Sequence, residues 1–347
     1  MSRQRVNLLD IDHQAFSKLD NRSKILHVLR LAVLAPSTHN TQPWMFEISG
    51  GNRCRLLLDP ERSLPMADSE LKYSYISLGA LLTNLHYAGK YYGLVKSIKV
   101  QTGSGNQVAL ILFDNETLRP DNTLRPYIRA MIDRQNFRGQ FDDRPVSITE
   151  LSDMLDLSDK NDHNIGVFSS QQSETTAEIA RLTAQGLQKA YSNRQFRVEV
   201  AKHLNFNKSK KTRGMHGYTL RMNNIQSLFL PWLLKIKDLG PKLARLNESS
   251  IRSSKAVVVL ATKANNAQSW VRTGQTLERL LLRAAQQDIR TSIFVASLEL
   301  SDSREQIKKR LGINTSYTPH VLFVLGRSSE RISYSHRERP EKLARFL

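Results

Sequence analysis

Two segments of the chain share one pattern, and this repeat constrains the fold more than any other feature. In residues 77–88 and 272–283 a glycine is followed by leucines three and six positions later, which aligns Gly79 with Gly274, Leu82 with Leu277 and Leu85 with Leu280. Each segment lies between two strand-like runs, which are residues 56–58 and 108–113 in the first case and residues 257–260 and 321–325 in the second. Any two amphipathic helices can be aligned on leucines, but the common order of strand, helix and strand favours two copies of one α+β unit. We therefore expect an α+β fold with antiparallel or mixed sheets covered by helices, in two related halves, residues 1–120 and 121–347.

The composition predicts a globular chain in a reducing compartment. Of the 347 residues, 40% are hydrophobic and 24% are charged, which excludes a disordered protein. Cys54 is the only cysteine, so the sequence excludes an internal disulfide and a cysteine-rich zinc site. Charged residues occur throughout the start of the chain, and no apolar run is long enough to span a bilayer. We expect a cytoplasmic protein without a membrane span.

The formal net charge of +19 predicts an anionic partner. A phosphorylated cofactor, a nucleic acid and an anionic membrane surface would all satisfy it. Nucleic-acid-binding proteins usually concentrate basic residues on one element and interleave them with aromatic residues. Here the basic residues are spread along the chain, and the cluster from Lys208 to Lys211 is expected to be a solvated face. We therefore expect no nucleic acid partner.

Residues 35–44 form a polar loop between a predicted helix and a predicted strand. Apolar residues recur at helical spacing up to Ala35, and Pro36 then disfavours helix for the residue before it. Between Pro36 and Pro43 the chain carries short polar side chains, and a strand-like run begins at Trp44. On local chemistry alone, a turn whose polar groups satisfy one another is the favoured interpretation, and a ligand-binding loop is the alternative.

The same loop resembles the signature of the nitroreductase-like flavoproteins, in which Ala-Pro-Ser followed by Asn, Gln-Pro and Trp lies against flavin mononucleotide (FMN). The resemblance is strongest to the fused, double-length branch of Acg-type proteins. It implies a nitroreductase-like fold in which two halves of one chain form an intramolecular pseudo-dimer. It also implies that FMN is bound by the loop residues Pro36, Ser37, Thr38, Asn40 and Gln42.

Residues 134–141 resemble a second element of that family, Arg-x-Ser/Thr-x-Arg-x-x-Phe, with Asn136 where a hydroxyl is usual. Alternate residues of an extended segment project to one side, so Arg134, Asn136 and Arg138 can face one ligand. A guanidinium can bind a phosphate through paired charge-assisted hydrogen bonds, or stabilise the negative charge of a reduced flavin. The resemblance assigns Arg134 and Asn136 to the phosphate or ribityl end of FMN and Arg138 to its pyrimidine edge. The alternative is a surface loop whose arginines pair with acidic neighbours, Asp133, Asp142 and Asp143.

The strand-like run 321–325 leads directly into Gly326 and Arg327. A glycine permits close approach of the backbone and an arginine can reach an anion, and family members commonly close their phosphate site in this way. Arg337 and Arg339 resemble the Arg-Arg-Pro tail of the double-length branch, although Glu338 interrupts the pair. A basic solvated tail is the alternative. The first half carries no counterpart of these elements, so we expect one FMN per chain.

Residues 191–248 resemble a region that can fold over the flavin as a lid in the double-length branch. They include an apolar cluster at residues 228–234 that contains Pro231. Packing of this cluster against the core of the protein is the favoured interpretation. A membrane-surface contact helped by nearby lysines is the alternative.

The resemblance implies an FMN-dependent oxidoreductase that transfers electrons from NAD(P)H to a nitroaromatic, quinone or related acceptor. A flavin-sequestering or storage protein of the same fold, with little reductase activity, is the alternative. The sequence identifies no catalytic acid or base, and its histidines have no metal-ligand spacing, so we expect no metal. It also contains no Gly-x-Gly-x-x-Gly or Walker sequence. The chain is expected to be a monomer, as a pseudo-dimer, or a homodimer.

Overall fold

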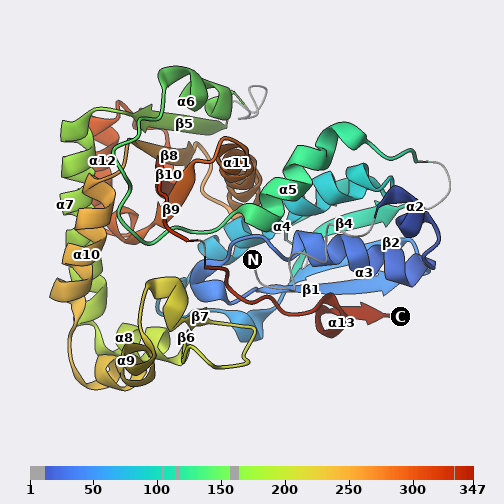
Figure 1. Cartoon of the computed structure of the whole chain (residues 1–347), viewed down its shortest axis with the longest axis horizontal. Coiled ribbons are helices and arrows are strands. Elements are labelled where there is room, and N and C mark those ends of the chain that lie inside the picture. The colour runs from blue at the N-terminus through green and yellow to red at the C-terminus, as the bar shows by residue number, and fades with distance from the viewer. Residues whose placement is uncertain (1–11, 104, 115–117, 157–163, 332) are drawn as a thin grey trace. The chain divides into compact units, whose positions relative to one another are not determined.

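The computed structural model describes residues 12–103, 105–114, 118–156, 164–331 and 333–347 (Figure 1). The chain divides into two compact units that alternate along the sequence. Unit 1 comprises Met1–Arg134, Asn266–Gln286 and His336–Leu347, and unit 2 comprises Gln135–Asn265 and Gln287–Ser335. The predicted halves, residues 1–120 and 121–347, are defined by an internal sequence repeat. Compact units are defined by contacts, so they do not test these halves, which stay a prediction.

Unit 1 contains a five-stranded mixed sheet in the order β11-β1-β2-β4-β3. Its strands are β1 (Trp44–Ser49), β2 (Arg53–Leu58), β3 (Val95–Val100), β4 (Gln107–Phe113) and β11 (Ala344–Phe346). The pairings are antiparallel except for β1 with β11, which run parallel. The strand-like runs 56–58 and 108–113 are confirmed as parts of β2 and β4.

Helices cover this sheet because their apolar faces and the inward side chains of the strands form one core. The α-helices of unit 1 are α2 (His13–Ser17), α3 (Asn21–Ala32), α4 (Lys72–Tyr91), α5 (Arg125–Asp133), α11 (Ala267–Gln286) and α13 (Pro340–Leu343). Its 3₁₀ turns are η1 (Thr38–Asn40), η2 (Pro60–Arg62) and η3 (Asn122–Leu124). Ile25 and Leu29 of α3, Phe46 of β1 and Leu82 of α4 belong to one fully buried cluster. Helix α3 ends at Ala32, earlier than the predicted end at Ala35, because the turn that precedes Pro36 already begins there.

The two repeat glycines meet where α4 and α11 cross. A Cβ added to Gly79 would lie 1.9 Å from Val271 O, and a Cβ added to Gly274 would lie 1.9 Å from Ile76 O. Gly79 therefore faces the Val271 carbonyl, three residues before Gly274, and Gly274 faces the Ile76 carbonyl, three residues before Gly79. The two helices thus make the same contact in both directions. Such a close approach of two backbones excludes any side chain at these positions. The two helices predicted from the repeat, at residues 77–88 and 272–283, are thus confirmed as helices and pack directly on each other.

Unit 2 contains a four-stranded antiparallel sheet in the order β5-β8-β10-β9. Its strands are β5 (Ile165–Ser170), β8 (Ala256–Thr262), β9 (Arg290–Phe294) and β10 (Thr318–Gly326), and a short parallel pair is formed by β6 (Leu204–Asn205) and β7 (Met215–His216). Every residue of β8 is buried, as expected for a strand covered on both faces. The runs 257–260 and 321–325 are confirmed as parts of β8 and β10, and the α+β class with antiparallel and mixed sheets is confirmed in both units.

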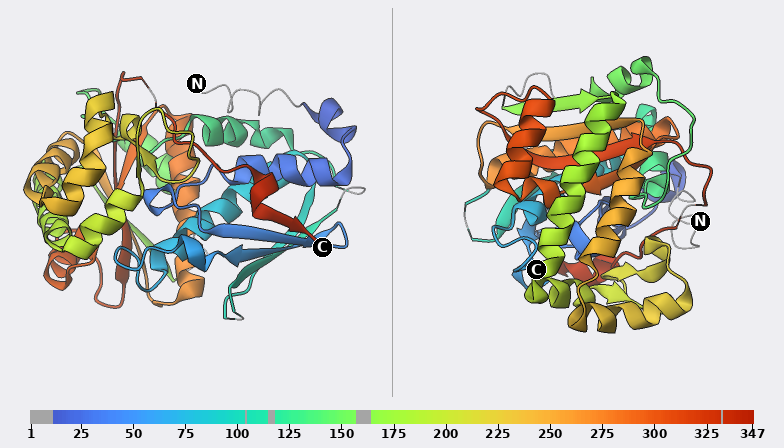
Figure 2. Two further views of the ribbon diagram at one scale, coloured as in Figure 1. Left: turned by 90° about the horizontal axis from the view of Figure 1, so that it is seen from below. Right: turned by 90° about the vertical axis from the view of Figure 1, so that its left-hand side faces the viewer.

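Two long helices of unit 2, α7 (Ser173–Ser192) and α10 (Gly240–Arg252), lie side by side in front of this sheet in the right-hand view of Figure 2. The α-helices of the unit are α6 (Ile148–Leu155), α7 (Ser173–Ser192), α8 (Arg194–Lys202), α9 (Asn224–Ile236), α10 (Gly240–Arg252) and α12 (Ser301–Arg310), and its 3₁₀ turns are η4 (Gly217–Leu220) and η5 (Ala296–Leu298). Ile179 of α7 and Ile251 of α10 pack with Val257, Val259 and Leu322 in the core. The predicted insertion, residues 191–248, runs from the end of α7 into α10, and its role as a lid stays a prediction.

Candidate functional site

The loop between α3 and β1 has an unusual backbone conformation. His39, Asn40 and Gln42 have φ angles of 48°, 57° and 56°. These values lie in the left-handed region that residues other than glycine rarely adopt. Each such residue costs roughly 1–3 kcal/mol, so surrounding contacts must hold the loop in this shape.

The side chains of Asn40 and Gln42 supply part of that hold. The Asn40 amide nitrogen donates to the His336 carbonyl at 3.1 Å, and the Gln42 amide oxygen accepts from the Glu338 backbone N–H at 2.8 Å. Within the loop, the Ser37 hydroxyl oxygen accepts from the Gln42 backbone N–H at 3.0 Å. Asn40 and Gln42 are 6% and 0% exposed. Their side chains therefore fix the loop to the C-terminal segment of unit 1, whereas the interpretation from local chemistry expected the polar groups of the turn to satisfy one another.

Arg337 caps the end of α3 from the same segment. Its guanidinium donates to the carbonyls of Val33, Leu34 and Ala35 at 2.9, 3.2 and 3.1 Å, and to the Asn40 amide oxygen at 2.8 Å. The last carbonyls of a helix have no partner within the helix and carry partial negative charge. Arg337 satisfies them, so it is a structural element of the loop rather than part of a solvated tail.

Arg134 reaches the same helix end and forms a buried ion pair. Its Nη2 donates to the Leu34 carbonyl at 2.7 Å, and its Nε lies 3.3 Å from Glu278 Oε1. The Arg134 and Glu278 side chains are 4% and 0% exposed. Burial raises the pKa of Glu278 to about 7, even though Arg134, Asn84 and Arg337 all favour the charged carboxylate. Arg134 thus belongs to unit 1, whereas Asn136 and Arg138 belong to unit 2.

The start of the loop keeps groups available for a ligand. Pro36, Ser37 and Thr38 are only half-buried. In the described part of the chain the backbone N–H groups of Ser37 and Thr38 donate no hydrogen bond. The backbone N–H groups of Ser37 and Thr38 are therefore donors of the predicted loop site that contacts within the described structure do not occupy.

Asn136 has a structural partner in unit 2. Its side-chain oxygen accepts from the Ile293 backbone N–H at 2.8 Å, and its backbone pairs with Thr291 in a short parallel bridge. The Phe137 backbone N–H donates to the Thr291 carbonyl at 2.7 Å. The segment is thus extended and bound along β9.

Arg138 is the predicted residue with the most available charge. Its guanidinium makes one polar contact to the described residues, to Met215 Sδ at 4.0 Å, and its side chain is exposed. The acidic neighbours proposed as its partners pair with other residues, Asp133 with Arg129, Asp142 with Arg144 and Asp143 with Lys255. The alternative in which Arg134 and Arg138 pair with these acids is therefore wrong. Arg138 therefore has no anionic partner among the described residues, although its surroundings bury the guanidinium enough to lower its pKa, an effect that Tyr191 partly offsets.

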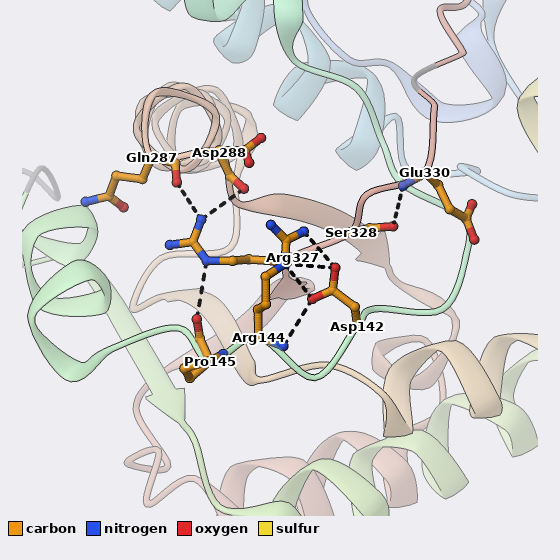
Figure 3. Close-up of polar contacts among 8 residues, drawn as sticks. All are labelled: Asp142, Arg144, Pro145, Gln287, Asp288, Arg327, Ser328 and Glu330. Carbon is orange, nitrogen blue, oxygen red and sulfur yellow. Dashed lines mark hydrogen bonds and ion pairs between the residues drawn. The ribbon is translucent and has the colours of Figure 1, made fainter.

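Arg327 is enclosed by protein acceptors at the end of β10 (Figure 3). Figure 3 shows its guanidinium donating to the carbonyls of Gln287 and Pro145, at 3.0 and 3.3 Å. The guanidinium also forms an ion pair with Glu150, which is not among the residues labelled there. A Cβ at Gly326 would lie 2.7 Å from the Phe141 ring. Gly326 thus allows Phe141 to pack, and an anion at Arg327 would have to compete with Glu150. Their assignment to a phosphate site stays a prediction.

Glu278 is a buried ionisable residue that is not among the residues predicted from the sequence, although its position on α11 indicates burial. It follows Leu277 and precedes Leu281 on the face of α11 that also carries Gly274, so helical spacing places a carboxylate among buried positions. A charged residue at such a position usually has a buried partner. Arg134 is that partner, but its identity depends on a contact between residues far apart in sequence.

No protein-family model and no curated protein sequence matches the chain. Similar solved structures include a nitroreductase with bound FMN from Desulfitobacterium hafniense DCB-2, with 13% identity, 63% of this chain and 96% of that chain covered, and a TM-score of 0.43. Nitroreductase A from Vibrio parahaemolyticus RIMD 2210633 has 10% identity, covers 60% of this chain and 70% of its own, and gives a TM-score of 0.37. NADPH:FMN oxidoreductase from Vibrio harveyi complexed with NAD+ has 10% identity, 59% and 70% coverage and a TM-score of 0.36. At such TM-scores and identities these likenesses carry no argument for the function, which rests on the residues described above.

The described residues contain neither a cluster of metal ligands nor a membrane-spanning helix. No group of three or more His, Cys, Asp or Glu side chains among them could hold a metal ion. Within the same residues, no helix is long and apolar enough to cross a membrane.

Proposed function

We propose that the chain is an FMN-dependent oxidoreductase that transfers electrons from NAD(P)H to a nitroaromatic, quinone or related small-molecule acceptor. The observation that carries this proposal is the loop at residues 35–44. Its sequence resembles an FMN-binding signature, and its backbone is held in a strained conformation. Its Ser37 and Thr38 N–H groups donate to no acceptor among the residues that the structure describes. Bound FMN would supply two-electron chemistry, and the chain would hold and orient it.

The residues assigned to FMN by resemblance fit it in two different ways. Arg138 is an exposed cation without an anionic partner in the described structure, so it is suited to the pyrimidine edge or to another anionic group of the cofactor. The side chains of Asn40, Gln42 and Asn136 already bind protein groups, as does Arg327. We infer that Asn40 and Gln42 act mainly by shaping the backbone of their loop in unit 1, and Asn136 and Arg327 by shaping the backbone around them in unit 2.

The pseudo-dimeric arrangement of two related halves belongs to the same proposal. The reciprocal crossing of α4 and α11 supports it, because Gly79 and Gly274 occupy equivalent positions there. On this arrangement we expect one FMN per chain. A cytoplasmic location and a monomeric or homodimeric state stay predictions.

Arg138→Ala tests the cofactor assignment, with Arg144→Ala as the matched control. Arg144 is an exposed arginine of the same unit whose guanidinium pairs with Asp142. Loss of charge-assisted hydrogen bonds should raise the Kd for FMN about 10- to 100-fold in Arg138→Ala. Fluorescence titration of the apoprotein with FMN measures this, and Arg144→Ala should bind as the wild type does. Equal affinities in the two variants would remove Arg138 from the site.

The reductase activity is tested separately from FMN binding. Wild-type protein loaded with one FMN per chain should oxidise NAD(P)H when a quinone or nitroaromatic compound is present. Binding of FMN without NAD(P)H oxidation would favour the flavin-sequestering alternative. A protein that cannot be loaded with FMN would refute both.

A further inference from the structure

Helix α9 exposes a continuous apolar face. Five large apolar side chains recur along it at intervals of three, one, three and four residues, which places them on one side of the helix. They are Ile225, Leu228, Phe229, Trp232 and Ile236, with exposures of 70%, 56%, 58%, 61% and 60%. Soluble proteins rarely expose a contiguous apolar surface of this kind without a binding role. For Leu228, Phe229 and Trp232 the expected packing against the core is therefore wrong.

The opposite face of α9 anchors the helix to unit 2. Leu234 is 1% exposed and packs with Val200 and Ala201 of α8, and Ser227 is 3% exposed. The helix begins with a capping box between Asn223 and Gln226. Figure 1 shows α8 and α9 together beside β6 and β7. The exposed apolar face thus stands on a helix with its own cap and its own buried face.

Basic residues flank α9 in the sequence and lie near both of its ends. Residues 202–246 contain ten lysines and arginines and a single acidic residue, Asp238. Lys235 and Lys237 lie at the C-terminal end of α9, and the basic loop 208–213 is connected to its start through Asn207, which donates to the Met222 carbonyl at 3.0 Å. All ten basic side chains are exposed, and within the described structure Arg221 is the one that forms an ion pair, with Glu330. The surface therefore combines apolar contact with strong positive charge.

We propose that α9 binds the surface of an anionic phospholipid bilayer, with its apolar face inserted among the acyl chains and the flanking lysines at the headgroups. A helix with aliphatic and aromatic residues on one face and flanking lysines has the chemistry of an interfacial helix, and anionic lipids attract basic residues near the surface. A second copy of the chain would bring the same positive charge to the contact, which disfavours self-association. A nucleic acid would match the charge but leave Ile225, Leu228 and Ile236 in water. This inference does not depend on flavin binding.

Trp232 provides a direct reporter of insertion. The other two tryptophans, Trp44 and Trp270, are 0% and 8% exposed, whereas Trp232 lies in the middle of the exposed face. The full chain should co-sediment with vesicles of phosphatidylcholine and phosphatidylglycerol, and its tryptophan emission should shift to shorter wavelength. Vesicles of phosphatidylcholine alone should bind it much more weakly, and added salt should weaken binding to the anionic vesicles.

The double substitution Leu228→Ser with Phe229→Ser removes two exposed apolar side chains and keeps Trp232. It should weaken binding to anionic vesicles at least about tenfold. Ile148→Ser is the matched control, because Ile148 is 79% exposed on α6 of the same unit and lies outside the proposed surface. Both variants should keep the wild-type circular dichroism spectrum.

Three outcomes would overturn the proposal. The first is wild-type protein that does not bind anionic vesicles. The second is equal binding by the wild type and the double variant, which would show that charge alone attracts the protein. The third is a wild-type dimer that the double variant abolishes, because the apolar face would then be covered by a second copy.

Discussion

Ionisation of Glu278 should lower the stability of unit 1. Its carboxyl is fully buried in α11, and Arg134 is its ion-pair partner at 3.3 Å. Burial raises the pKa of Glu278 from 4.5 to about 7, so the cost of desolvating the carboxylate exceeds the attraction of Arg134. The folded chain therefore binds this proton more tightly than the unfolded chain does.

The sign and size of the effect follow from that shift. Because the pKa is raised on folding, the contribution of Glu278 to the free energy of unfolding is fully present below pH 4.5. This contribution is lost as pH rises from 4.5 to about 7, and the effect of Glu278 on the free energy of unfolding does not change further above that pH. One pKa unit corresponds to 1.36 kcal/mol, so the total loss is about 3 kcal/mol.

Glu278→Gln keeps the shape of the side chain and removes its titration. Urea unfolding between pH 5 and 8, followed by tryptophan fluorescence, reports on unit 1 because the buried Trp44 and Trp270 both belong to it. Relative to Glu278→Gln, the wild type should lose most of the ~3 kcal/mol over this interval. Glu61→Gln, which removes an exposed carboxylate of the same unit, should give no comparable change.

Two results would contradict this reasoning. A difference between wild type and Glu278→Gln that does not change with pH would show that the carboxyl is ionised in the folded chain over this interval, as it is in the unfolded chain. A difference that favours the wild type more as pH rises would show that the attraction between Arg134 and the ionised Glu278 exceeds the cost of desolvating this carboxylate.

Two other features of unit 1 give predictions of their own. His27 is 1% exposed, and burial, with a smaller effect of Arg30, lowers its pKa to about 4, so stability should be full above pH 6.5 and fall as pH decreases toward 4. His27→Phe should abolish this loss of about 3 kcal/mol in a urea series extended down to pH 4, and a difference from the wild type that is constant with pH would refute it. Gly79→Ala and Gly274→Ala should each lower the free energy of unfolding by more than about 2 kcal/mol, because a Cβ would lie 1.9 Å from a backbone oxygen of the facing helix. Urea midpoints close to the wild-type value would show that α4 and α11 can separate without cost.

Local sequence patterns predicted the regular elements of the fold well. Helical spacing of glycine and leucine found α4 and α11, and apolar runs found β4, β8 and β10. These predictions succeeded because side-chain periodicity reports directly on which face of an element is buried.

The same patterns could not determine which surface covers an apolar face. Residues 228–234 read as a core segment, yet Leu234 is buried while Leu228, Phe229 and Trp232 are exposed. Periodicity shows that a face is apolar, and whether that face meets protein depends on contacts between distant segments. Likewise, the pairing of Glu278 with Arg134 joins residues far apart in sequence.

The loop at residues 35–44 shows how such distant contacts shape a candidate site. Its left-handed residues are held by hydrogen bonds to residues 336–338, and Arg337 also satisfies the carbonyls at the end of α3. Because the side chains of Asn40 and Gln42 bind residues 336 and 338, two residues of the motif that resembles a ligand-binding signature stabilise the conformation of their own loop. In the described part of the chain, the backbone N–H groups of Ser37 and Thr38 donate no hydrogen bond and stay available to a ligand. A ligand of this loop would therefore be recognised chiefly by backbone geometry, which in turn depends on the C-terminal segment.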